Sequence, residues 1–143
     1  MSTTSEQSFQ EIRKAVHGRS DDEVLAWVDQ REGGADALLN LVFEELPGAL
    51  IADRAGESVI SFQFVIETSG GTRNYFALIE DGKCHCAHGE TSGPTVSMRM
   101  DVVVFLRVLT GSLAPVRAFL SRRIKVTGDM MTATKFESWF ARP

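Results

Sequence analysis

The chain has 143 residues, of which 43% are hydrophobic and 24% are charged, and its formal net charge is -4 at pH 7. These values are typical of one globular domain with a core of its own, and they disfavour a disordered chain. The negative charge also argues against a general nucleic-acid-binding protein, which normally presents a basic surface.

The sequence predicts neither a secretory signal nor a membrane-spanning helix. Residues 1–8 are polar and predict a flexible tail, not a secretory signal. No uncharged apolar run approaches the roughly 18 residues that a membrane-spanning helix needs. Cys84 and Cys86 alternate in an expected strand, so their side chains should project side by side without forming a disulfide. We therefore expect a cytoplasmic protein with at most transient membrane contact.

The first third of the chain is expected to be helical. Apolar residues at helical spacing predict a first helix that ends near Gly18, and Ser20-Asp-Asp-Glu23 has the pattern of a capping box that opens a second. A third helix should stop at Pro47-Gly48. We interpret residues 9–38 as a helical N-terminal extension, a scaffold or dimer element within a single domain over residues 9–143.

From Ser58 onward the hydrophobic period changes to two, which is typical of strands. The even-numbered residues from Ile60 to Ile66 should share one face of the first strand. Asp81-Gly82 is a strong hairpin signal between a second and a third strand. The expected strands are residues 58–66, 74–79, 83–88, 95–100 and 123–127.

The stretch after the fourth strand carries more apolar residues than one helix face needs. Asp101 should cap a helix over Val102–Thr110 that is apolar almost all round, and such a helix is normally buried all round. Pro115 suits the first turn of a short helix, and Gly128-Asp129 should turn the chain into a last apolar helix. The element order predicts an α+β domain in which helices pack on one five-stranded sheet.

Several short motifs occur in a characteristic order between Leu39 and Phe140. They are Phe62-Gln-Phe64, Asp81-Gly82, Thr95-Val-Ser-Met98 followed by Asp101, Gly111-Ser-Leu-Ala-Pro115, Ala118-Phe119-Leu-Ser121 and Ile124-Lys-Val-Thr-Gly-Asp129. On these motifs the chain resembles the sterol carrier protein type two domain, especially its small bacterial stand-alone forms. The resemblance implies a mostly antiparallel, mixed sheet covered by helices on one face.

The resemblance also implies a hydrophobic tunnel between sheet and helices, which in the family takes fatty acyl chains, fatty acyl-CoAs, sterols or other lipids. The last helix of the family often acts as a lid. Arg122 stands where the family usually has glycine, which would alter the tunnel mouth. The residues that we expect to line the tunnel are Phe62, Phe64, Phe105, Leu109, Phe119, Met130, Phe136 and Phe140.

The same apolar surplus has a simpler interpretation, because such residues commonly fill a protein core or a dimer interface. Arg122 and Arg123 are the candidate ligands for a head group, in a basic cluster with Arg117 and Lys125. That cluster could bind a carboxylate, a phosphate or an anionic membrane, or it could be a solvated face.

The segment from Cys84 to His88 superficially resembles a metal or catalytic site. A strand would put Cys84, Cys86 and His88 on one face and His85 on the other, whereas tetrahedral zinc needs converging ligands, usually with a second ligand pair elsewhere. His85 or His88 with Glu90 could be an acid-base pair, with a cysteine as nucleophile, but no signal for an activated thiol accompanies them. We therefore expect no metal, no cofactor and no catalytic residue here.

The sequence predicts a non-catalytic binding or carrier protein for a hydrophobic small molecule such as a fatty acid, fatty acyl-CoA or sterol. One alternative is an enzyme that acts on a hydrophobic intermediate in the same cavity. Another is a dimerisation or interaction module in which the cavity is collapsed. The expected partner is a hydrophobic ligand, with no nucleic acid and with a homodimer as an open option.

Overall fold

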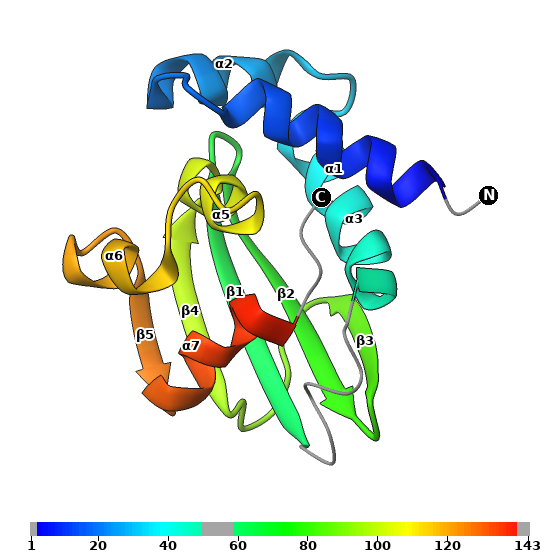
Figure 1. The fold of residues 1–143 in the computed structure, drawn as a ribbon, viewed down its shortest axis with the longest axis vertical. Helices are drawn as coiled ribbons and strands as arrows, with labels where there is room; N and C mark the ends of the chain where they lie inside the picture. Colours follow the sequence, from blue (N-terminus) through cyan, green and yellow to red (C-terminus); the bar gives the residue numbers. More distant parts are fainter. Residues whose placement is uncertain (1–2, 50–58, 140–143) are drawn as a thin grey trace.

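The computed structural model describes residues 3–49 and 59–139, in which helices pack on a five-stranded sheet (Figure 1). The element order is the one expected from the sequence. The helices are α1 Thr3–Val16, α2 Asp21–Gln30, α3 Gly34–Glu45, α5 Val102–Leu109, α6 Pro115–Leu120 and α7 Met130–Trp139, with the 3-10 helix η1 Leu46–Ala49. The strands are β1 Ile60–Thr68, β2 Gly71–Glu80, β3 Lys83–His88, β4 Val96–Asp101 and β5 Lys125–Gly128.

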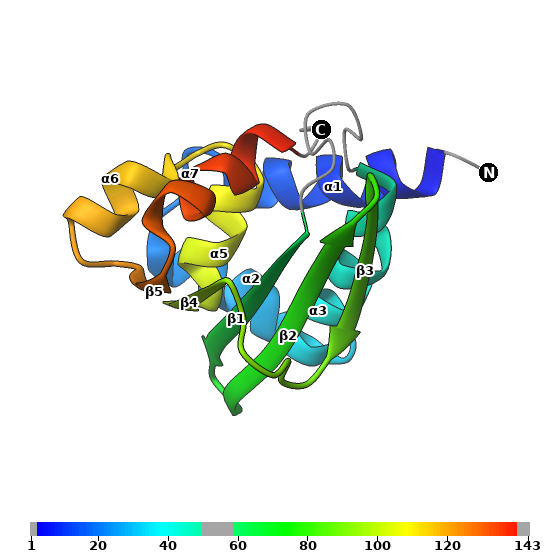
Figure 2. The same cartoon turned by 90° about the horizontal axis from the view of Figure 1, so that it is seen from below.

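The sheet is mixed, as expected. Its strand order is β3-β2-β1-β4-β5, and β1 pairs parallel with β4 while the other neighbours pair antiparallel. The strand β5 therefore forms the edge farthest from β3, and α6 and α7 lie beside it (Figure 2). None of the helices within the described ranges is both long and apolar enough to cross a bilayer.

One face of the sheet carries the core. The register pairs Phe62 with Ala77 on β2 and with Val96 on β4, and all three side chains are buried under the helices. The opposite face is more exposed, apart from Gln63. The side-chain amide of Gln63 donates to the carbonyls of Tyr75 and Gly89 at 3.0 and 3.1 Å, and its oxygen accepts from the backbone of Thr91. The glutamine thereby ties the loop after β3 to the middle of the sheet.

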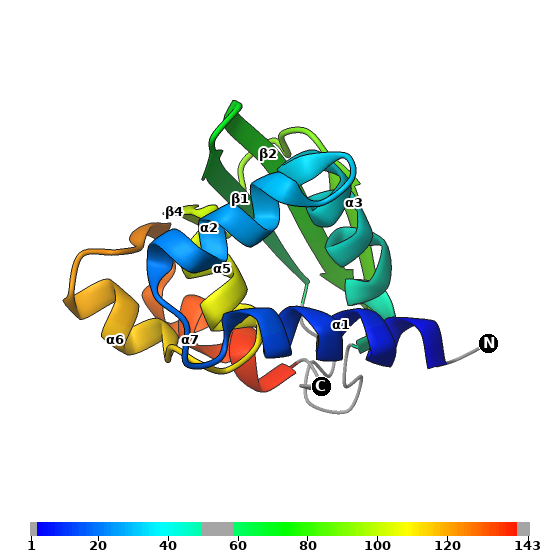
Figure 3. The same ribbon diagram turned by 90° about the horizontal axis from the view of Figure 1, so that it is seen from above.

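Helix α5 is covered on both sides, which explains its apolar composition. Its first five residues, Val102 to Leu106, are all buried. One side packs on β1 and β4, and the other packs on α1 and α2 (Figure 3). The additional apolar residues of this helix therefore pack against other parts of the protein. This agrees with the interpretation that they fill a protein core.

The N-terminal helices belong to the same core as the sheet. Helix α1 begins at Thr3, within the stretch 1–8 for which the sequence suggested a flexible tail. Its apolar residues Phe9, Ile12 and Val16 are buried, together with apolar residues of α2 and α3. The apolar face of the extension is therefore occupied inside the chain. The capping box of α2 is present, with Ser20 and Glu23 each accepting from the other's backbone N–H.

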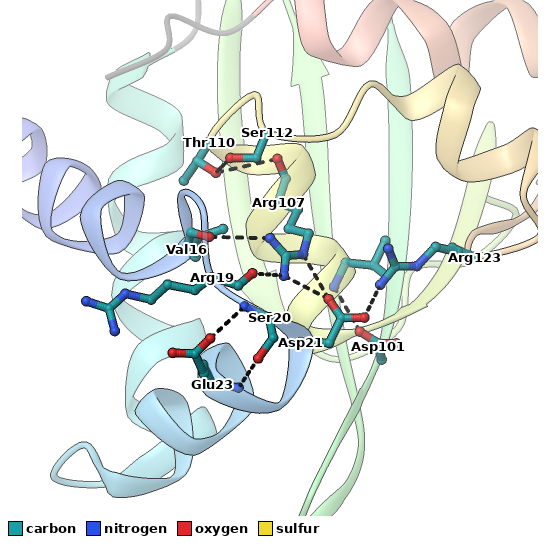
Figure 4. A network of polar contacts seen from close by, with 11 residues as sticks. Val16, Arg19, Ser20, Asp21, Glu23, Asp101, Arg107, Thr110, Ser112 and Arg123 are labelled. Carbon is teal, nitrogen blue, oxygen red and sulfur yellow. Dashed lines mark hydrogen bonds and ion pairs between the residues drawn. The ribbon is translucent and has the colours of Figure 1, made fainter.

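A single arginine joins the extension to α5 (Figure 4). The Arg107 guanidinium donates to the carbonyl of Val16 at 3.3 Å, to the carbonyl of Arg19 at 2.7 Å and to Asp21 Oδ1 at 2.8 Å. Val16 is the last residue of α1, so its carbonyl lacks a partner within that helix. Asp21 also accepts from Arg123 at 2.9 Å, so one carboxylate connects the extension with the segment after α6.

Replacing Arg107 with alanine should destabilise the domain. The change removes charge-assisted hydrogen bonds from a mostly buried guanidinium, so we expect a loss of about 2–3 kcal/mol in the free energy of unfolding. Urea titration monitored by tryptophan fluorescence measures this. Asp22→Asn is the matched control, because no ion pair of Asp22 occurs within the described residues, and it should stay within about 0.5 kcal/mol of the parent. Equal effects of both changes would contradict the assigned role of Arg107.

Candidate functional site

An apolar pocket of about 300 Å³ lies where α6 and α7 meet the β4–β5 edge of the sheet. Met98 comes from the helix-covered face of β4, and Val126 pairs with it from β5. Ile124, just before β5, supplies the buried base. The remaining described lining residues come from the two helices and are also apolar: Pro115, Val116, Phe119, Leu120, Met130, Met131 and Ala133.

Two of the eight residues expected to line a tunnel, Phe119 and Met130, line this pocket. Phe62, Phe64 and Phe105 are instead fully packed in the core. Leu109 is half-buried and packs against that core. The side chain of Phe136 and all of Phe140 lie outside the described part of the chain.

Aromatic contacts surround two of the expected lining residues, Phe64 and Phe105. The Phe43 ring of α3 stacks on Phe105 and on Tyr75, with centroid distances of 5.5 and 4.4 Å, and lies 5.4 Å from Phe64. Such contacts favour a close-packed interior. The sequence shows that these residues face the helices, but it does not show that Phe43, far away along the chain, occupies the space between them.

Several lining residues that sequence reasoning left out follow from the topology. Met98 shares a face with the core residues Val96 and Met100, yet β4 lies next to the short edge strand β5, where the helix cover is thin. Ala133 of α7 is buried and lines the pocket, and its small side chain leaves room there. The alternation of β4 gave the orientation of Met98, but only the strand order places it at the pocket.

Helix α6 ends in a Schellman motif that positions Arg122. The backbone N–H of Arg123 donates to the carbonyl of Ala118 at 2.8 Å, and that of Arg122 donates to the carbonyl of Phe119 at 3.0 Å. Arg122 has φ +62°, a left-handed conformation that glycine adopts at lower cost. This left-handed conformation explains why the family that the sequence resembles usually has glycine where this chain has Arg122.

The two candidate head-group arginines have different surroundings. Arg122 is exposed and lines a second, adjoining depression, together with Lys125 and pocket residues such as Phe119. Arg123 forms the ion pair with Asp21 shown in Figure 4, and it is not among the described lining residues of the pocket. Arg122 is therefore the arginine that could meet the polar end of a ligand in the pocket.

The start of α7 is fixed by a tight approach of two backbones. Gly128 has φ +101°, and a Cβ at this position would collide with the carbonyl oxygen of Thr95. Asp129 then caps α7, since its carboxylate accepts from the backbone of Met131 and from the hydroxyl of Thr132 at 3.0 and 2.9 Å. These hydrogen bonds, with those from Thr132 foremost, lower the pKa of Asp129 below its usual value. The cap supports the helix that carries one wall of the pocket.

The cysteine-histidine segment does not form a reactive cluster. Cys84 and Cys86 have free thiols whose sulfur atoms lie 3.7 Å apart on the helix-facing side of β3. The pKa of Cys84 is lowered because Cys86 donates a hydrogen bond to it, and the pKa of Cys86 is raised for the same reason and by burial. His85 points to the opposite face of the sheet. Within the described residues, no three metal-ligating side chains converge.

Replacing Arg122 with glycine should stabilise the protein. The left-handed conformation costs a residue with a side chain about 1–2 kcal/mol, part of which glycine returns through its greater freedom in the unfolded state. We therefore expect a gain of about 1 kcal/mol in the free energy of unfolding, measured by urea titration. Arg122→Ala, which keeps the strained backbone, serves as the control and should bring no such gain. A loss of stability in Arg122→Gly would show that the arginine makes a compensating contact.

The chain is similar to known proteins over its C-terminal two thirds. The family model described as the SCP-2 sterol transfer family matches residues 52–141. The hydroxysteroid dehydrogenase-like protein 2 of Xenopus tropicalis is 39% identical over 79 residues, which cover 53% of this chain and 18% of that protein. The chain thus corresponds to less than a fifth of that relative.

Solved structures share the fold at low sequence identity. The sec-alkylsulfatase Pisa1 from Pseudomonas sp. gives a TM-score of 0.66 at 14% identity, covering 73% of this chain and 16% of that one. A palmitated SCP2L2 from Aedes aegypti gives a TM-score of 0.53 at 16% identity, covering 68% of this chain and 88% of that one. Both likenesses concern the fold alone.

Proposed function

Because the chain belongs to the SCP-2 sterol transfer family, we propose that it binds and carries a hydrophobic small molecule in the pocket between α6, α7 and the β4–β5 edge. The observation that carries this proposal is the lining, because every described residue of it is apolar. A cavity without polar groups attracts a ligand through burial of apolar surface, worth about 25 cal/mol per Å².

An acyl chain or another flexible hydrocarbon suits this pocket well. Methionines adapt to irregular apolar shapes, and three of them, Met98, Met130 and Met131, contribute to the lining. The palmitated protein of the same fold supports a fatty acid as one ligand class. A sterol or a fatty acyl-CoA is the other class that the family suggests.

A carrier is favoured over an enzyme. General acid-base or nucleophilic catalysis needs a titratable or nucleophilic side chain at the reacting atoms. The described lining contains only aliphatic, aromatic, thioether and proline side chains. The adjoining depression contains the Arg122 guanidinium, which can orient a ligand carboxylate through charge-assisted hydrogen bonds.

Filling the pocket should abolish binding. Ala133→Phe would place a ring in a pocket of about 300 Å³, so we expect the affinity for a fluorescent fatty acid to fall at least tenfold. Fluorescence titration measures the change, and Ala26→Phe on the exposed side of α2 is the matched control. In the parent protein, affinity should rise about fourfold per added CH₂ until the chain fills the pocket. No saturable binding of acyl, acyl-CoA or sterol probes to the parent would overturn the proposal.

The proposed head-group role can be tested by comparing a fatty acid with the fatty alcohol of the same length. Arg122→Gln should weaken binding of the acid about tenfold and leave the alcohol nearly unchanged, because only the acid can form a charge-assisted hydrogen bond. Arg19→Gln is the matched control, since that exposed arginine lies between α1 and α2 and belongs to neither depression. Competition titrations give both ratios. An equal loss for acid and alcohol would assign Arg122 to the pocket wall instead.

A further inference from the structure

The exposed apolar side chains of this protein gather at one place. Among the residues whose side-chain exposure the structure describes, six large apolar residues are exposed, and only Val59 of these lies away from α6 and α7. Leu120 and Met131 are the most exposed of the six, at 73% and 70%. The other members are Val116, Phe119 and Met130. These five residues, which we term the α6–α7 rim, all line the pocket.

Three exposed cations lie on α6, on β5 and on the turn between them. Arg117, Lys125 and Arg122 are exposed, and none of the ion pairs between described residues involves them. Other arginines of the chain, such as Arg73 and Arg107, bind carboxylates. The nearby Asp129 uses its oxygens to cap α7. The chain as a whole has a net charge of -4, so this cluster is a local excess of the opposite sign.

We propose that the α6–α7 rim and these three cations form a docking surface for anionic phospholipid membranes. Exposed apolar residues on a short helix can enter the boundary between head groups and acyl chains, while neighbouring arginine and lysine side chains bind lipid phosphates. An apolar patch of this kind on a water-facing surface marks an interaction site. The partner is a bilayer because the patch combines apolar residues with cations of one sign.

Docking through the rim would bring the pocket to the membrane surface. The rim residues are also pocket residues, so a docked protein would hold the pocket against the acyl-chain region of the bilayer. A hydrophobic ligand could then move between membrane and pocket without crossing water. This exchange step rests on the proposed carrier function, whereas the docking itself does not. Helix α1 takes no part, since its apolar residues Phe9, Ile12 and Val16 are buried in the core.

Co-sedimentation of the full chain with lipid vesicles tests the docking. We expect binding to vesicles of phosphatidylcholine with phosphatidylserine, little binding to phosphatidylcholine alone, and a loss of binding at high salt. The triple variant Arg117→Gln, Arg122→Gln, Lys125→Gln should bind about a hundredfold more weakly, because each cation near an anionic leaflet contributes about fivefold. The matched control neutralises three exposed cations elsewhere: Lys14→Gln, Arg19→Gln and Lys83→Gln.

The apolar part of the surface has its own pair of variants. Leu120→Ser with Met131→Ser should weaken vesicle binding at least tenfold, whereas Val59→Ser, at a residue 63% exposed, should leave it unchanged. Thermal unfolding confirms that each variant is folded. Equal losses in the rim variants and their controls, or no binding of the parent to anionic vesicles, would overturn the proposal. So would a parent dimer that the rim variants dissociate, because the rim would then be an interface between copies.

A vesicle-free titration separates this inference from the carrier function. The neutral probe N-phenyl-1-naphthylamine should bind the parent protein in solution if the pocket takes hydrophobic ligands. Probe binding without vesicle binding overturns the docking and leaves the carrier function standing. Vesicle binding without probe binding supports the docking and counts against the carrier function.

Discussion

The structure depends on the burial of α5, whose first five residues are all buried. A helix that is apolar all round is stable in water only when every side is covered, so the sheet alone could not have sufficed. The second cover comes from α1 and α2. The polar residue within α5, Arg107, is compatible with this position because the carbonyls of Val16 and Arg19 and the carboxylate of Asp21 accept hydrogen bonds from its guanidinium. Removing those partners would leave a charge in a mostly buried place.

This burial decides where a ligand can bind. Between the sheet, α3 and α5, the rings of Tyr75, Phe43 and Phe105 stack on one another in the core. The cover becomes thin only toward β5, a four-residue strand with the short helix α6 and with α7 above it. The apolar residues of this edge are therefore left partly exposed around a cavity. Their exposure costs solubility and stability unless something binds there, which is the physical reason to assign function to this edge.

The carboxylate of Asp21 connects the N-terminal extension with two segments of the C-terminal half of the chain. Asp21 binds Arg107 of α5 and Arg123, which directly follows the left-handed Arg122 at the end of α6. The ion pair on Arg123 and the Schellman hydrogen bond of its backbone hold the turn that presents Arg122 beside the pocket. The N-terminal extension, which lies before the matched family region, thus helps to position the candidate binding site.

The sequence by itself determined the local structure, because its signals are local. The capping box at Ser20, the cap at Asp101, Pro115 in the first turn of α6 and the alternation from Ile60 to Ile66 each involve neighbouring residues, and all occur as expected. Together with the family motifs they predicted the mixed five-stranded sheet with helices packed on it. They also gave the inward orientation of Phe62, Phe64 and Phe105.

Only the tertiary structure decided which inward-facing residues fill the core and which surround a pocket. That outcome depends on what covers each residue, and the covering groups lie far away along the chain. Phe43 fills the space beside Phe105, and the N-terminal helices cover the outer side of α5, whereas nothing comparable covers Leu120 or Met131 in the described residues. Both α5 and the α6–α7 rim carry more apolar residues than one helix face needs. Those of α5 are buried against other elements, whereas those of the rim are exposed.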